Sequence, residues 1–314
     1  MTTRAHEEGT AMPTFATPDP IFAVIDLESA HVRINAGDRT DTVVEVRPSD
    51  ASNDADVHAA EHVQVEFADG RLLVHADRDA TAPVSGWGIA LNALMESPPG
   101  WARSLLGWGG SVEVTVNLPA GSRVEAKAAD LRCLGHLGEV RFTTSDGDIR
   151  VEEASRLWLK SVSGDISVTR STGHADVTAT HGDIRVGEIV GSALIKTSHG
   201  SITLGEVRGE LRLNSSHGDV TVDRALAGVV AKTAYGSLRI GEVPSGSVVM
   251  ETTGGGLELG IREGTAAWLD VSSRYGTVDV SLDSCDGPAQ SDEAVEFVEV
   301  RAHTAHGDIV IHRS

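Results

Sequence analysis

Hydrophobic and polar residues alternate along the last two thirds of the chain, and a short glycine-centred unit interrupts this alternation at regular intervals. The unit reads SDGDI, VSGDI, THGDI, SHGSI, SHGDV and AYGSL in successive copies, with looser copies such as RYGTV and AHGDI further on. Its first six glycines follow one another at steps of 17, 18, 18, 18 and 18 residues. The repeated glycines are Gly147, Gly164, Gly182, Gly200, Gly218 and Gly236, then Gly255, Gly276 and Gly307. A fixed period of this size is typical of a solenoid, in which each repeat is one coil of a stack.

Each repeat carries alternating apolar residues on both sides of its glycine. Ala193 and Ile195 precede Gly200 in this way, and Ile202 and Leu204 follow it. Alternation is the period of a strand with one buried face, and glycine permits the sharp turn between two strands. Stacked coils would pair strand on strand about 4.8 Å apart, as parallel sheets. The sequence therefore predicts an all-β protein, a parallel β-solenoid with coils of about 18 residues.

An N-terminal β region is predicted over residues 20–121, where the alternation lacks the 18-residue period, and residues 1–19 are expected to be disordered. The Asp69-Gly70 pair between two apolar runs is a hairpin signal, and the polar stretch 48–60 predicts a loop. The candidate strands are 21–27, 31–35, 42–47, 62–67, 71–76 and 112–118.

The solenoid is predicted to follow over residues 122–314, beginning with a partial coil near 122–138. The spacing of the repeat lengthens near its end, where residues 283–298 are acidic and contain glycine and proline. We interpret this stretch as a surface loop inserted before a final coil at 299–313.

A tryptophan-rich insertion at 81–110 interrupts the N-terminal region. It contains Trp87, Trp101 and Trp108 and two short helical patterns. The pattern is compatible with a helical cap over an open end of the solenoid, with a partner-docking or membrane-touching segment, and with a disordered insertion. Because tryptophan is enriched at interfaces, these three residues are the candidate partner-binding residues.

The chain resembles a bacterial putative-adhesin domain family of unknown function, also described as a β-strand-repeat or toastrack-like domain. The resemblance is carried by the N-terminal strand pairs, by VNLPAG at 116–121, and by the serial SDGDI, SGDI and HGDI turns, and it covers roughly residues 20–313. It implies a β-solenoid without an established catalytic activity or defined catalytic residues. It also implies links to surface adhesion or envelope-stress sensing.

Composition limits the class of partner and the compartment. The formal net charge of −20 argues against nucleic acid and anionic membrane surfaces as partners. The N-terminal sequence lacks the pattern of a secretory signal and no run of 18 apolar residues occurs, so a cytoplasmic location is expected. The two cysteines do not form a disulfide framework: Cys133 is expected in the core and Cys285 in an exposed loop.

Two columns of side chains flank the repeated glycines and invite a metal hypothesis. The position before the glycine holds His181, His199, His217, Tyr235, Tyr275 and His306, and the position after it is most often Asp. Side chains on neighbouring coils point the same way about 4.8 Å apart, which favours stacking over chelation at about 2 Å per ligand. The aspartates occur once in 18 residues, unlike calcium-binding β-rolls, so each is expected to close its own turn. No metal and no cofactor is predicted.

Charged residues elsewhere in the repeat are expected to form a solvated edge. Glu188, Glu206 and Glu242 would repel one another when stacked, and Arg185, Arg208 and Arg239 are expected to offset them. No GxSxG, Walker A, HExxH or CxxC motif occurs.

These features together predict a non-enzymatic β-solenoid scaffold or interaction protein, adhesin-like by resemblance, in envelope-stress or regulatory signalling. Its expected partner is an unidentified protein, and self-association into a homo-oligomer is left open. The rival prediction is a carbohydrate-binding or carbohydrate-active solenoid enzyme.

Overall fold

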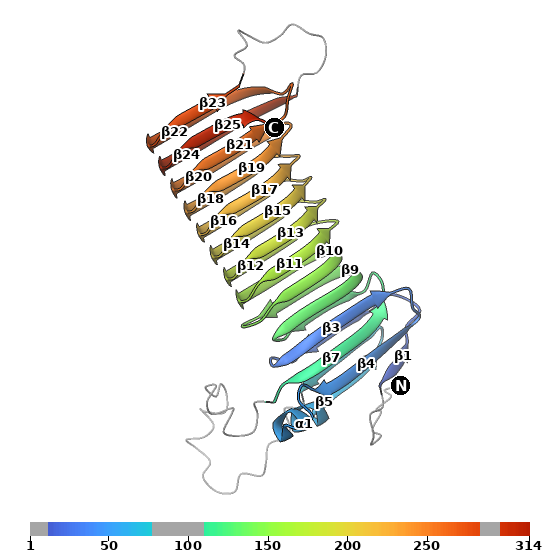
Figure 1. Ribbon diagram of the computed structural model, residues 1–314. Helices are drawn as coiled ribbons and strands as arrows, with labels where there is room; N and C mark the ends of the chain where they lie inside the picture. Colours follow the sequence, from blue (N-terminus) through green and yellow to red (C-terminus); the bar gives the residue numbers. More distant parts are fainter. Residues whose placement is uncertain (1–11, 77–109, 283–295) are drawn as a thin grey trace, which may run out of the picture. The chain divides into compact units, whose positions relative to one another are not determined.

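The computed structural model describes residues 12–76, 110–282 and 296–314, and the chain forms two compact units, Met1–Thr144 and Ser145–Ser314 (Figure 1). The expectations for Trp87, Trp101, Trp108 and Cys285 lie outside the described residues. The disorder expected over residues 1–19 lies outside them for 1–11 and is wrong at Thr14–Ala16, which form a strand. The boundary expected between residues 121 and 122 stays a prediction. The strands on either side of it, β7 and β8, belong to the first unit.

The first unit is a stack of parallel strands bordered by antiparallel ones. Its elements are β1 (Thr14–Ala16), β2 (Phe22–Asp26), β3 (Ala30–Gly37), β4 (Asp41–Pro48), α1 (Asp54–Glu61), β5 (Val63–Ala68), β6 (Arg71–Ala76), β7 (Val112–Pro119), β8 (Arg123–Lys127) and β9 (Asp130–Thr144). Strand β2 runs parallel between β6 and β8, and β3 runs parallel between β7 and β9. The most N-terminal coil is therefore inserted between two coils that follow it in sequence.

The antiparallel border of this unit includes the predicted hairpin. Strand β5 pairs antiparallel with β6 across Asp69 and Gly70, whose φ values of 52° and 74° give the tight turn expected of an Asp-Gly pair. Strand β4 pairs antiparallel with β7 and with β1.

The loop expected over residues 48–60 is wrong in its second half, because residues Asp54–Glu61 form the helix α1. The Asn53 side chain caps this helix by accepting a hydrogen bond from the Ala55 N–H at 3.0 Å. Buried Asp56 accepts from the backbone N–H groups of Asp50 and Ser111, at 3.0 and 2.8 Å. These tertiary hydrogen bonds stabilise a polar helix, and its sequence has little of the apolar periodicity from which a helix is predicted.

The second unit confirms the predicted β-solenoid, with strands stacked in parallel like rungs (Figure 1). Through most of this unit, neighbouring coils pair at the same repeat position, so that Ile195 lies opposite Leu213 and Ile202 lies opposite Val220. Its strands are β10 (Ile149–Ser163), β11 (Ile166–Ser171), β12 (Ala175–His181), β13 (Ile184–Ile189), β14 (Ala193–His199), β15 (Ile202–Val207), β16 (Leu211–His217), β17 (Val220–Ala225), β18 (Val229–Tyr235), β19 (Leu238–Val243), β20 (Gly246–Gly254), β21 (Leu257–Ile261), β22 (Ala266–Tyr275), β23 (Val278–Ser281), β24 (Phe297–His306) and β25 (Ile309–Arg313).

The order of the last coils in space differs from their order in sequence. Strand β24 pairs with both β20 and β22, and β25 pairs with both β21 and β23. The expected final coil therefore lies inside the stack, and β22 and β23 form the last coil. The coils share the same register except for a shift between Ile240 and Val243, where β19 pairs with β21. The period therefore does not encode which coil lies next to which.

The core of this unit is a thin aliphatic layer between the two columns of strands. Ile195, Leu213, Ile202 and Leu204 are fully buried, as the alternation predicts. Among the described residues, no helix has the length and apolar character required to cross a bilayer.

Candidate functional site

The repeated glycines form a column in which backbones pack directly on one another. Gly147, Gly164, Gly182, Gly200, Gly218, Gly236, Gly255 and Gly307 have φ between 123° and 151°, which L side chains rarely adopt. A Cβ at Gly200 would lie 2.1 Å from the carbonyl oxygen of Gly182, and one at Gly276 would lie 2.1 Å from that of Gly307. Glycine is thus required both by the turn and by the close approach of the next coil.

The aspartates after these glycines connect neighbouring coils. The expectation that each Asp closes its own turn is wrong. Asp165 Oδ1 accepts a hydrogen bond at 2.8 Å from the backbone N–H of Asp183, and Asp183 Oδ1 accepts one at 2.9 Å from Ser201. Asp148, Asp219 and Asp308 bond in the same way to Asp165, Ser237 and Thr277. Parallel stacking places the next coil's N–H closer to the carboxylate than any group of its own turn.

Glutamates and arginines on the other edge of the coils form a continuous chain of ion pairs, which we call the Arg–Glu ladder. Its members lie in contact at 2.6 to 3.8 Å, in the order Arg170, Glu188, Arg208, Glu206, Arg224, Glu242, Arg262 and Glu296. The expected offset by Arg208 is correct. Arg185 and Arg239 instead pair with Asp183 and Glu258.

The residues before the glycines form a column of exposed, stacked rings, which we call the ring column. His181, His199 and His217 stack with centroids 5.0 Å apart and planes within 6° of parallel. Tyr235 continues the stack at 5.2 Å from His217, and Tyr275 stacks on His306 at 4.9 Å. Parallel rings do not direct their nitrogens toward a common point, and no group of three ligating side chains suited to a metal ion occurs in the described residues.

The ring column is interrupted at one position. Gly254 lies opposite Tyr235 on one side and His306 on the other, so one position of the ring column has no side chain. Tyr235 is 57% exposed, close to the 62% of Tyr275, although Tyr275 ends the column and Tyr235 lies inside it. Two strand spacings of about 4.8 Å separate the flanking rings, which is the room that one further stacked ring occupies.

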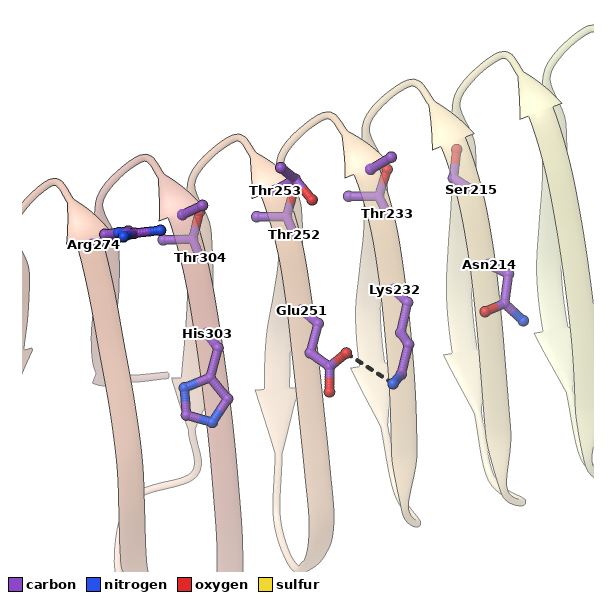
Figure 2. Close-up of a pocket in the computed structure, with 12 residues that line it drawn as sticks. Asn214, Ser215, Lys232, Thr233, Glu251, Thr252, Thr253, Arg274, His303 and Thr304 are labelled. Carbon is purple, nitrogen blue, oxygen red and sulfur yellow. Dashed lines mark ion pairs between the residues drawn. The ribbon is translucent and has the colours of Figure 1, made fainter.

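An open groove of about 620 Å³ crosses β16, β18, β20, β24 and β22 beside this interruption. Figure 2 shows Asn214, Lys232, Glu251 and His303 at the same level on successive strands, with Thr253 and Arg274 nearer the turns. The lining residues are Asn214, Ser215, Lys232, Thr233, Ala234, Glu251, Thr252, Thr253, Arg274, His303, Thr304 and Ala305. The groove and the interrupted ring column belong to the same strand ends. Three of the lining residues, Ala234, Thr253 and Ala305, immediately precede Tyr235, Gly254 and His306 in the sequence.

The groove combines hydrogen-bonding side chains with a single carboxylate. Glu251 is the one acid among its lining residues and forms an ion pair with Lys232 Nζ at 2.8 Å. His303 Nδ1 lies 2.8 Å from the Ser272 hydroxyl. The Thr252 and Thr304 hydroxyls donate to the carbonyl oxygens of Gly236 and Gly255 in the adjacent coils. Glycoside hydrolysis requires a pair of carboxylates, which this groove does not provide.

Cys133 lies in the core of the first unit, as expected, and burial raises the pKa of its thiol, which disfavours the nucleophilic thiolate.

The groove itself was not predicted from the sequence. Most of its lining positions are outward and vary between copies of the repeat, so no motif distinguishes them.

A parallel β-solenoid is the class of protein that these features define. The chain belongs to the Toastrack DUF4097 family, whose model matches residues 23–312 and confirms the resemblance found in the sequence. None of the curated proteins compared matches the chain.

The chain also has low similarity to several solved structures. A putative adhesin from Parabacteroides merdae is 11% identical, with a TM-score of 0.32, covering 79% of this chain and 95% of its own. A putative lipid binding protein from Parabacteroides distasonis is 11% identical, with a TM-score of 0.26 and coverages of 97% and 94%. A putative adhesin from Bacteroides fragilis is 10% identical, with a TM-score of 0.24 and coverages of 97% and 98%.

Proposed function

We propose that this protein is a non-enzymatic, adhesin-like interaction protein that binds its partner in the groove of the second unit. The groove is the observation that carries the proposal. Asn214, Lys232, Glu251 and His303 face outward on consecutive coils, so an extended partner crossing the coils meets a polar group about every 4.8 Å. This role agrees with the surface adhesion that the family resemblance implies.

The absence of catalysis is part of the proposal. Glu251 is neutralised by Lys232 and has no second carboxylate among the groove residues with which to share acid–base work. The aspartates beside the glycines accept hydrogen bonds from the adjacent coil and so have a structural role. Binding without turnover is the behaviour that this arrangement supports.

A glycan is the second candidate partner, and the interruption of the ring column favours it. The C–H bonds of a sugar ring carry partial positive charge and pack on the negative face of an aromatic ring. The open face of Tyr235, above Gly254 and opposite His306, offers room for one such ring beside the hydroxyl and amide groups of the groove. A glycan partner would retain the binding function and replace the predicted protein partner.

The test is binding of the full chain to arrays of glycans and of extended peptides, followed by affinity measurement on the hits. Lys232→Ala with Glu251→Ala removes both members of the groove ion pair and leaves neither charge unpaired. We expect affinity to fall at least tenfold with an unchanged melting temperature. The matched control is Arg239→Ala with Glu258→Ala, which removes another exposed pair between neighbouring coils, at 3.6 Å, outside the groove.

A variant that fills the empty position of the ring column distinguishes a glycan partner from a peptide partner. Gly254→His places a ring in the interruption, and its Cβ would require only a small shift of the Tyr235 ring, 3.2 Å away. Glycan binding should be lost in this variant and retained in Gly256→Ala, whereas a peptide held by the groove alone should bind to both. Affinity unaffected by the groove double variant, or conversion of any array ligand, would contradict the proposal.

Three finer predictions accompany this function. The cellular setting is envelope-stress or regulatory signalling, which requires the groove double variant to fail in restoring a stress response to a deletion strain. A cytoplasmic location stays a prediction that cell fractionation checks. Trp87, Trp101 and Trp108 stay candidate partner contacts, for which Trp101→Ala should abolish capture with little change in melting temperature.

A further inference from the structure

The last coil of the second unit presents unpaired strand edges. Among the described residues, β22 pairs with β24 alone and β23 pairs with β25 alone. Each interior coil pairs with a neighbour on both sides. An edge of this kind carries a row of free N–H and C=O groups, which are able to pair with another strand.

The same coil leaves apolar side chains at core positions uncovered. Val278 and Val280 are 43% and 39% exposed, whereas Ile309 and Ile311, directly opposite them on β25, are 1% and 0% exposed. On the other column of strands, Leu269 and Val271 are only partly buried, whereas Val300 and Ala302 opposite them are fully buried. The end of the unit is therefore an apolar layer with one face uncovered.

We propose that a second copy of this chain covers this end, with β22 of one copy pairing antiparallel with β22 of the other about a two-fold axis at Ser272. Antiparallel pairing centred on Ser272 places Asp270 opposite Arg274 of the second copy, and the converse pair forms by symmetry. Directly opposite residues share a face of the sheet, and Asp270 and Arg274 both lie on the outward face. The edge is thus complementary in charge to itself.

The surroundings of Arg274 and Asp270 agree with this register. Within the described part of the chain Arg274 has no carboxylate partner, and its guanidinium lies 5.7 Å from the Tyr275 ring centroid. The ion pair that Asp270 forms with described residues is a long one, to His303 Nε2 at 3.8 Å. The two-fold axis is perpendicular to the sheet that contains β22 and therefore continues through the core toward the sheet that contains β23. The exposed Val278 and Val280 of one copy thus face those of the other copy on the inner side of the paired strands.

The molar mass of the full chain in solution, measured by sedimentation velocity over a range of concentrations, tests the dimer. Asp270→Arg and Arg274→Asp each place like charges opposite one another and should weaken dimerisation at least tenfold. The double variant exchanges the two charges and should restore it. Asp176→Arg, at the same repeat position of an interior coil, is the matched control and should leave the dimer unchanged.

A cross-link tests the register independently. In a Cys285→Ser background, Ser272→Cys places two thiols at the two-fold axis, within reach of a disulfide. We expect an oxidised dimer from Ser272→Cys and none from Ser198→Cys on an interior coil. A monomer at all concentrations, as results if residues 283–295 cover this end, would overturn the proposal. A dimer insensitive to both charge reversals and without the cross-link would overturn it as well.

Asp270 does not line the groove, so its reversal separates this inference from the proposed function. Loss of the dimer with unchanged ligand binding would leave the groove proposal intact. Loss of ligand binding in the groove double variant, in a protein that remains dimeric, would leave the dimer intact.

Discussion

Asp219 accepts a hydrogen bond at 2.8 Å from the backbone N–H of Ser237, which occupies the same repeat position in the next coil. Ser201, at that position in the preceding coil, makes no corresponding side-chain bond to the N–H of Asp219 among the described contacts. The carboxylate reaches across one strand spacing, and the shorter serine side chain does not. Aspartate at this position therefore joins coils, which explains its recurrence without invoking calcium.

Replacement of Asp219 by Ala should lower the free energy of unfolding by about 1 kcal/mol, because an exposed charge-assisted hydrogen bond is lost. Asp219 has no ion pair among the described residues, so the change isolates the hydrogen bond. Ser201→Ala, at the equivalent position, should change stability by about 0.5 kcal/mol or less. Urea unfolding of both variants measures the difference, and equal values would show that the bond contributes nothing.

The pH dependence of the last coil should follow Asp308. The N–H and hydroxyl of Thr277 both donate to Asp308 Oδ1 at 2.8 Å and hold the pKa of this carboxyl below its usual 3.8. A pKa lowered by folding contributes stability that is present above the usual value and is lost as the pH falls through the folded value. The pairing of β22 and β23 with β24 and β25 should therefore weaken in acid below pH of about 4.

Hydrogen exchange of the Thr277 amide across this pH range measures the effect. In Asp308→Asn the side chain no longer titrates, so protection of the amide should be lower at neutral pH and nearly independent of pH. Protection that falls equally in both proteins between pH of about 5 and 3 would contradict the assignment.

The sequence predicted the coil and its inward residues because both depend on local periodicity. Ile195 and Leu213 are buried where alternation places them, and the glycines recur where backbones of adjacent coils touch. The order of the last coils was not predictable, since any coil of this register fits beside any other. The helix α1 depends on buried Asp56 and its tertiary partners, which no local pattern reveals.

The groove could not be predicted for a related reason. Most of its residues occupy outward positions of five coils, where the repeat imposes no residue type. The insertion of β24 also brings His303 beside Glu251 across more than 50 residues. The interruption at Gly254 was visible as a departure from the His and Tyr series. Its meaning depends on Tyr235 and His306 flanking it in space.

Two adjacent glycines test the column of turns. A Cβ at Gly255 would lie 2.1 Å from the carbonyl oxygen of Gly236, at a φ of 151°, whereas a Cβ at Gly256 would meet only the Asp308 oxygen at 3.5 Å. Gly255→Ala should cost about 2 kcal/mol or more, because coils must separate locally to admit the methyl group. Gly256→Ala should be tolerated. Thermal melts of the two variants compare them, and equal melting temperatures would mean that the close approach at Gly255 is not required.

The division between inward and outward residues has its sharpest test at two neighbouring positions on β14. Ile195 is fully buried and Lys196 is exposed. Ile195→Asp places an unpaired carboxylate between two sheets and should cost about 4 kcal/mol or more, enough to disrupt the coil and its neighbours. Lys196→Asp should change stability by about 0.5 kcal/mol or less, because the side chain remains in water. Circular dichroism melts should separate the variants widely, and comparable losses at both positions would show that this strand does not present alternate faces to core and solvent.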